Sequence, residues 1–284
     1  MVSMENENIN EESNEEKYRT ESFNKGFTKL EASRGRWETL LEVLGETRPA
    51  DGRMQVYIIK ELQKELIALV KALGIQSVFT MVFSKIHESN MTKTCRDLQE
   101  AEESAKKIWE LHKQMVKFIY YEGKIILQRQ KDGKIMKGIG FSPPNLCELV
   151  PRIGLPEEGF DGKSTEPSKE AISDMISKVK EFHKTFGHPI GSAVWGHEDG
   201  PPGGLNKHRI LLRTSLIREE FQELSEGCRK GDWVEIMDGI GDLEYVILGS
   251  VVELGITIDI LLQPELDEGK LTLDLTSIPR EIRQ

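Results

Sequence analysis

The chain has 284 residues, of which 38% are hydrophobic and 30% are charged, enough for one large or two ordinary domains with hydrophobic cores. Its formal net charge of -10 argues against sequence-independent binding to a nucleic-acid backbone, which requires clustered lysine and arginine. Three widely separated cysteines support neither a zinc knuckle nor a disulfide framework. No run is apolar enough for a signal peptide or a membrane span, so we expect a cytoplasmic protein, with a nuclear location as the alternative.

Residues 1 to 22 are rich in Glu, Asn and Ser and have few apolar residues to bury, which predicts a disordered acidic tail. From Phe23 to about Phe83 the apolar residues recur at helical spacing, and Gly74 predicts a helix end. The segment TCRDLQEAEESAKKIWELHKQMVKFI predicts another helix. Alternating β-formers around a turn at Lys131 to Lys134 then predict a small hairpin near residues 118 to 141.

Residues 151 to 170 combine Pro, Gly and charged residues without periodicity, which predicts a linker between two domains. An amphipathic helix follows and ends at Gly187. Two more helices are expected after a loop rich in Gly and Pro, from about Lys207 to Cys228 and from about Asp232 to Gly255. Residues 263 to 284 are expected to form a loose C-terminal extension.

The last two of these helices carry carboxylates among apolar residues. On a helical wheel, Glu220 and Glu223 lie inside or at the edge of the apolar face of the first helix, and Glu235, Asp238 and Asp242 share one stripe of the second. Burial of ionised carboxylates is unfavourable unless a positive charge compensates. Mg²⁺ prefers oxygen ligands and is commonly held by a few carboxylates. A solvated acidic face would explain either motif alone, but the two together predict a metal site.

Three segments between residues 172 and 258 together resemble the all-α nucleoside triphosphate pyrophosphohydrolase superfamily: VKEFHKTFGHPIG, RILLRTSLIREEFQEL and DGIGDLEYVILGSVVELGI. This superfamily includes MazG, phosphoribosyl-ATP pyrophosphohydrolase, and dimeric dUTPase and dCTPase relatives, and its phage and bacterial MazG-like branch is the most similar. The resemblance implies an all-α helical bundle that forms oligomers. It also implies Mg²⁺-dependent hydrolysis of an NTP or dNTP to the monophosphate and pyrophosphate, with Mn²⁺ as the alternative ion and nucleotide-pool sanitation as one role.

The family motifs imply a role for each matching residue. The implied metal ligands lie on both helices: Glu220, Glu223, Asp238 and Asp242. Glu219 would assist a second metal or the attacking water, and either Glu219 or Glu223 would accept the proton of that water. Arg213 or Tyr245 would orient or contact the substrate.

One position departs from the family pattern. Much of the superfamily has Glu where this chain has Gly239. The working pair on the second helix is therefore either Asp238 with Asp242 or Glu235 with Asp238.

The family's H-x-S-N-x-x-K segment does not follow Gly255, but a match occurs upstream in FSKIHESNMTK, residues 83 to 93. The chain therefore resembles two tandem MazG-like modules, a degenerate one at residues 23 to 150 and a complementary one at residues 171 to 262. Asn90 and Lys93 of the first would reach phosphates held over the metal of the second, within an intrachain pseudo-dimer or a homo-oligomer. The alternative is that both residues lie at a helix end in water, and a lone histidine such as His87 is expected to be structural or exposed.

Two functions follow as hypotheses. The first is a pyrophosphohydrolase acting on a nucleoside triphosphate, with neither a nucleic acid nor a membrane as partner. The second is a catalytically inactive relative that binds a nucleotide or a protein, as the degenerate first module and Gly239 would allow.

Overall fold

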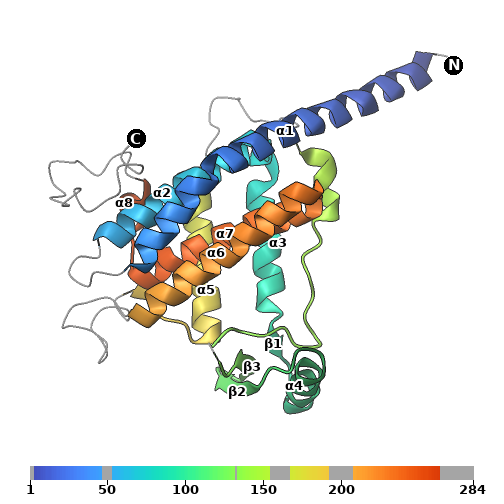
Figure 1. The fold of residues 1–284 in the computed structure, drawn as a ribbon. Coiled ribbons are helices and arrows are strands. Elements are labelled where there is room, and N and C mark those ends of the chain that lie inside the picture. Colours follow the sequence, from blue (N-terminus) through green and yellow to red (C-terminus); the bar gives the residue numbers. More distant parts are fainter. Residues whose placement is uncertain (1–2, 47–52, 132, 154–166, 192–206, 263–284) are drawn as a thin grey trace.

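A computed structural model describes residues 3–46, 53–131, 133–153, 167–191 and 207–262. Most of these residues are helical, and a small antiparallel sheet lies with α4 at one end of the bundle (Figure 1). The helices are α1 (Ser3–Gly45), α2 (Arg53–Ala72), α3 (Phe79–Met91), α4 (Leu98–His112), α5 (Lys169–Phe186), α6 (Lys207–Lys230), α7 (Trp233–Leu254) and α8 (Ile258–Leu262). The 3-10 turns are η1 (Gln76–Val78) and η2 (Cys147–Arg152). The strands are β1 (Thr94–Cys95), β2 (Val116–Tyr121) and β3 (Lys124–Arg129).

Helix α7 is the central helix of the bundle. Its side chains are apolar nearly all round, as expected of a helix buried on every side, and it packs against α2, α3, α5 and α6. Aromatic pairs join the N-terminal helices to the C-terminal ones: Trp37 stacks on Phe221 with ring centroids 4.6 Å apart, and Phe83 stacks on Tyr245 at 5.4 Å. One hydrophobic core therefore contains helices from both parts of the chain. The expected tandem modules stay a prediction, and the linker and C-terminal extension fall largely outside the described residues.

The predicted helix ends are confirmed. Gly187 and Gly255 cap α5 and α7 in the left-handed conformation, with φ of 67° and 66°, which glycine adopts without steric cost. Helix α2 ends at Ala72, two residues before Gly74. At the other end of the chain, α1 begins at Ser3, within the segment predicted to be a disordered tail. That segment contains neither Gly nor Pro, so it has no residue that strongly disfavours a helix.

The turn of the hairpin lies earlier in the chain than predicted. Strands β2 and β3 pair from Val116 with Arg129 to Tyr121 with Lys124, and Glu122 and Gly123 form the turn with φ of 47° and 76°. Two consecutive residues with positive φ are typical of a tight hairpin turn. The chain turns again after β3, where the Gly133 amide donates to the Arg129 carbonyl at 2.9 Å. The sequence thus marked the second turn and missed the first.

The helix predicted to begin at Thr94 is shorter than expected. Strand β1 takes its first residues and pairs with β3, and α4 starts only after Asp97, whose carboxylate accepts a hydrogen bond from the Glu100 amide at 2.8 Å. This N-cap fixes the start of the helix.

No single helix in the described parts of the chain is long and apolar enough to cross a membrane. The bent pair Met54–Ala72 and Gln76–Met91, at 111°, passes the same test by length and composition.

Candidate functional site

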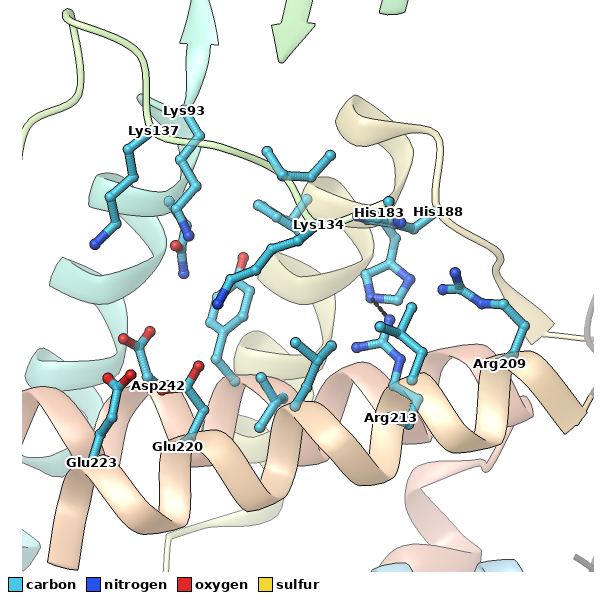
Figure 2. Close-up of a pocket in the computed structure, with 18 residues that line it drawn as sticks. Lys93, Lys134, Lys137, His183, His188, Arg209, Arg213, Glu220, Glu223 and Asp242 are labelled. Carbon is cyan, nitrogen blue, oxygen red and sulfur yellow. Dashed lines mark hydrogen bonds between the residues drawn. The ribbon is translucent and has the colours of Figure 1, made fainter. Parts of the chain in front are cut away.

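A cavity of about 200 Å³ lies where α3, α5, α6, α7 and the segment after β3 meet. Figure 2 shows carboxylates on one wall, carried by α6 and α7, and lysine side chains that extend toward them from the opposite wall. Histidine and arginine side chains gather at the far end of the same pocket (Figure 2). The pocket therefore combines side chains from before and after the predicted linker at residues 151 to 170.

The acidic wall is formed by Glu220 and Glu223 on α6 and Asp242 on α7. Burial raises the pKa of Glu220 to about 8, and the charges of Asp242 and Glu223 add to the effect. Burial also raises the pKa of Asp242 to about 6, with Asp238 the next contributor. These carboxylates are thus held together at an energetic cost that a cation would offset.

Gly239 allows α6 and α7 to approach closely. A Cβ atom added at this position would lie 2.8 Å from the Cα atom of Leu224, so a glutamate side chain does not fit there. Glu235 lies on the surface and pairs with Lys230 at 2.9 Å. Burial raises the pKa of Asp238, and the positive charge of the nearby Lys137 opposes that rise. Of the two alternatives for α7, the geometry favours Asp238 with Asp242.

The donor set fits a hard cation. Within the described ranges, no three His, Cys, Asp or Glu side chains form a group that could hold a metal ion as they stand. The pocket nevertheless offers oxygen donors alone on its acidic wall, the chemistry that Mg²⁺ and Mn²⁺ accept. The raised pKa values of Glu220 and Asp242 arise from burial and from repulsion by neighbouring carboxylates, which a bound divalent cation would relieve.

The basic wall consists of Lys93, which follows α3, and Lys134 and Lys137, which follow β3. Burial lowers the pKa of Lys93, and the charges of Asp242 and Glu220 oppose that shift. Lys134 forms an ion pair of 2.5 Å with Glu219, which lies half-exposed beside the pocket. Sequence reasoning missed Lys134 and Lys137, although the lysines of KDGKIMKG were a usable signal.

The predicted substrate-side residues also line the pocket. Asn90 is buried there, 6% exposed, rather than facing water at the helix end. The Tyr245 hydroxyl lies 3.0 Å from Nδ1 of His87, and burial raises the pKa of the tyrosine. His87 is buried beside Tyr245, which fits the structural of the two roles expected of a lone histidine.

Arg213 is engaged in a buried cluster at the far end of the pocket. It pairs with Glu253 and lies 3.2 Å from Nε2 of His183. Burial and the Arg213 charge lower the pKa of His183 to about 4 and that of His188 to about 3, so both rings are neutral near pH 7. Although burial opposes it, Arg213 and Arg209 hold the pKa of Glu253 at about 2. The sequence did not single out this cluster, because its members lie far apart along the chain.

The acidic wall lies within the part of the chain that matches a known protein family. The phosphoribosyl-ATP pyrophosphohydrolase family model matches residues 179–264. An uncharacterized protein of Acanthamoeba polyphaga mimivirus is 37% identical over 81 residues, which are 28% of this chain and 31% of that protein. The chain therefore spans about a third of the length of this relative. No solved structure matches.

The family match confirms the resemblance for residues 179–264. This region contains α6 and α7 with all the candidate carboxylates. It excludes Asn90, Lys93, Lys134 and Lys137, so the basic wall comes from outside the matched region.

Proposed function

We propose that the chain is a Mg²⁺-dependent nucleoside triphosphate pyrophosphohydrolase, which converts an NTP or dNTP and water to the monophosphate and pyrophosphate. The observation that carries this proposal is the pocket itself, where carboxylates of α6 and α7 face lysines of the N-terminal part across about 200 Å³. A triphosphate carries several negative charges and is bound in proteins by divalent cations together with lysine. Both kinds of group are available here.

The metal-holding residues in this proposal are Glu220, Glu223, Asp238 and Asp242. When bound, Mg²⁺ supplies neutralisation of phosphate charge and a lowered pKa for a coordinated water. Glu235 is set apart from this group by its surface ion pair with Lys230. Mn²⁺ accepts the same oxygen donors and is the alternative ion.

The chain's own groups then position and activate the reactants. Lys93 and Asn90 contact phosphate or ribose oxygens from the basic wall. Water attacks the α-phosphorus, the bond to the bridging oxygen of the β-phosphate breaks, and pyrophosphate leaves in line with the attack. A carboxylate accepts the proton of the water. Glu223 lines the pocket, whereas Glu219 is paired with Lys134 at its rim, so Glu223 is the better placed base.

The arrangement also bears on assembly. Asn90 and Lys93 line the pocket within one chain, so the proposed site needs no second subunit to supply them. We therefore favour an intrachain pseudo-dimer as the catalytic unit, and a homo-oligomer remains compatible with it. A cytoplasmic location is part of the same proposal.

The test is pyrophosphate and monophosphate release from a panel of NTPs and dNTPs with and without Mg²⁺. Glu220→Gln and Asp242→Asn are expected to lower turnover by at least about 100-fold. Loss of a residue that only orients a metal ligand lowers activity about 10- to 100-fold, and loss of the ligand itself should lower it more. Glu226→Gln is the matched control, since this α6 residue is exposed and paired with Arg229. Absence of pyrophosphate from every nucleotide would sink the proposal, and Mg²⁺-dependent nucleotide binding without turnover would favour the inactive nucleotide-binding relative. Undiminished turnover after Glu223→Ala would remove that residue from the mechanism.

A further inference from the structure

The segment that follows β3, residues 133–142, passes along the basic side of the pocket and is called the strap here. Hydrogen bonds hold its first part to β3: the Arg129 amide donates to the Lys134 carbonyl and the Met136 amide to the Leu127 carbonyl, both at 2.8 Å. Two side chains hold its second part. Ser104 Oγ accepts from the Ile139 amide, and Thr92 Oγ1 accepts from the Ser142 amide, each at 2.9 Å. The strap is therefore anchored along its length.

This anchoring decides which side chains enter the pocket. Met136 packs into the hydrophobic cluster between α4 and the sheet. Lys134 and Lys137, on either side of it, line the pocket instead. Figure 2 shows both lysines extending toward the wall that carries Glu220, Glu223 and Asp242. An added Cβ at Gly138 would lie only 3.1 Å from Ser104 Oγ, so the chain next to Lys137 sits tightly on α4.

The strap lysines converge with Lys93. Lys137 and Lys134 both act on the Lys93 ammonium, and their charges lower its pKa. Three like charges directed at one cavity are unfavourable unless an anion lies among them. The carboxylates opposite satisfy part of this charge, but in the proposed enzyme they hold the metal. A polyanion bound together with a divalent cation between the two walls would satisfy both sets of groups, because the anion faces the lysines and the cation faces the carboxylates.

Lys134 can change partner at little cost. Its present partner Glu219 is 42% exposed and Lys134 itself 36%, and ion pairs that open to water contribute little to stability. Lys137 Nζ lies 4.6 Å from the centre of the Phe141 ring, a contact that holds the ammonium near the pocket without neutralising its charge.

We propose that Lys134 and Lys137 of the strap bind the β- and γ-phosphates, and that they make the site selective for a triphosphate over a monophosphate. This inference rests on the proposed function, since it assigns the leaving pyrophosphate group to these two side chains. It adds binding residues that lie outside the region matched by the family model. The α-phosphate then lies toward the carboxylates and Lys93, and the pyrophosphate leaves along the strap.

The experiment is calorimetric titration of the full chain with inorganic tripolyphosphate, and separately with orthophosphate, in the presence of Mg²⁺. Lys134→Gln and Lys137→Gln are each expected to weaken tripolyphosphate binding about tenfold, and the double variant about 100-fold, because each removes one charge-assisted hydrogen bond. Lys131→Gln is the matched control: it is an exposed lysine in the preceding turn that does not line the pocket, and its binding should match the wild type. Thermal melting of each variant verifies the fold.

Each outcome bears on the inference. Weaker binding in the strap variants alone supports it, and so does orthophosphate binding that is weak and insensitive to both substitutions. Tripolyphosphate binding by the double variant at wild-type strength overturns it, as does failure of the wild type to bind tripolyphosphate. If binding depends on the strap lysines but no nucleotide yields pyrophosphate, the proposed function fails while the polyphosphate site stands.

Discussion

Replacing Gly239 with alanine tests the close approach of α6 and α7, on which the carboxylate cluster depends. The added Cβ would lie 2.8 Å from the Cα, 3.0 Å from the Cβ and 3.1 Å from the nitrogen of Leu224. These are mostly backbone atoms, so the helices must separate to admit the methyl group. Overpacking of this kind costs roughly 1–3 kcal/mol, whereas replacing a helical glycine with alanine gains up to about 1 kcal/mol. We expect a net loss of about 1–2 kcal/mol in the free energy of unfolding.

Gly35→Ala is the matched control for this prediction. Gly35 is exposed in α1, and nothing lies within 4 Å of its added Cβ. Only the helix-propensity effect applies there, so we expect a gain of roughly 0.5–1 kcal/mol.

Urea unfolding followed by far-ultraviolet circular dichroism compares the two variants, because the midpoint at constant slope reports stability. The midpoint should fall for Gly239→Ala and rise for Gly35→Ala. Pyrophosphate release should fall in the first variant only, because separation of α6 from α7 displaces Glu220 from Asp242. A midpoint that rises in both variants would refute the close approach, and with it the reason given for glycine at this position.

Three further predictions concern charge. In metal-free buffer, Glu220→Gln and Asp242→Asn should leave the urea midpoint unchanged or raise it, because each removes one of the repelling half-buried carboxylates. Addition of Mg²⁺ should raise the midpoint of the wild type alone. A lower midpoint in both metal-free variants would contradict the repulsion. The neutral, buried His183 should contribute stability that is lost as the pH drops from 6.5 to about 4, because its folded pKa is about 4 against 6.5 and the unfolded chain binds more protons in that window. Glu253, whose pKa is held at about 2 against 4.5, adds a loss below 4.5. The raised pKa values of Glu220 and Asp242 act in the opposite direction, so the difference in stability between the wild type and His183→Asn isolates the histidine. That difference, taken from urea midpoints at each pH, should shrink as the pH drops from 6.5 to 4; a difference that does not change with pH would count against the neutral buried ring. Lys93→Met should raise KM for the nucleotide at least about tenfold, measured by initial rates, and an unchanged KM would place Lys93 outside the binding site.

Much of the helical fold could be predicted from local sequence. Glycine caps and apolar spacing are local signals, so the ends of α5 and α7 at Gly187 and Gly255 were located within a residue. The position of Glu220 and Glu223 toward the pocket followed from the helical wheel, because residues three or four positions apart share a helix face. Identification of Asn90 and Lys93 depended on the family motif instead, and the structure places both in the same pocket as the carboxylates.

The parts that could not be predicted depend on contacts between distant segments. Glu235 shares the stripe of Asp238 and Asp242 but lies one turn nearer the start of α7, where Lys230 is within reach. Either Arg213 or Tyr245 was expected to orient or contact the substrate, and both line the pocket. The pairing of Arg213 with Glu253 was not expected, because it joins residues 40 positions apart. Lys134 and Lys137 were missed because the hairpin was centred on the wrong turn, which left the direction of the strap side chains unassigned.

The most direct test of the central claim is hydrolysis of a nucleoside triphosphate in ¹⁸O-labelled water with Mg²⁺, followed by mass spectrometry of the products. Attack of water on the α-phosphorus, which the facing carboxylate and lysine walls are proposed to promote, places the label in the nucleoside monophosphate and leaves pyrophosphate unlabelled. Label in pyrophosphate or orthophosphate, or an absence of turnover with every nucleotide tested, would contradict the assignment of this pocket to pyrophosphohydrolysis.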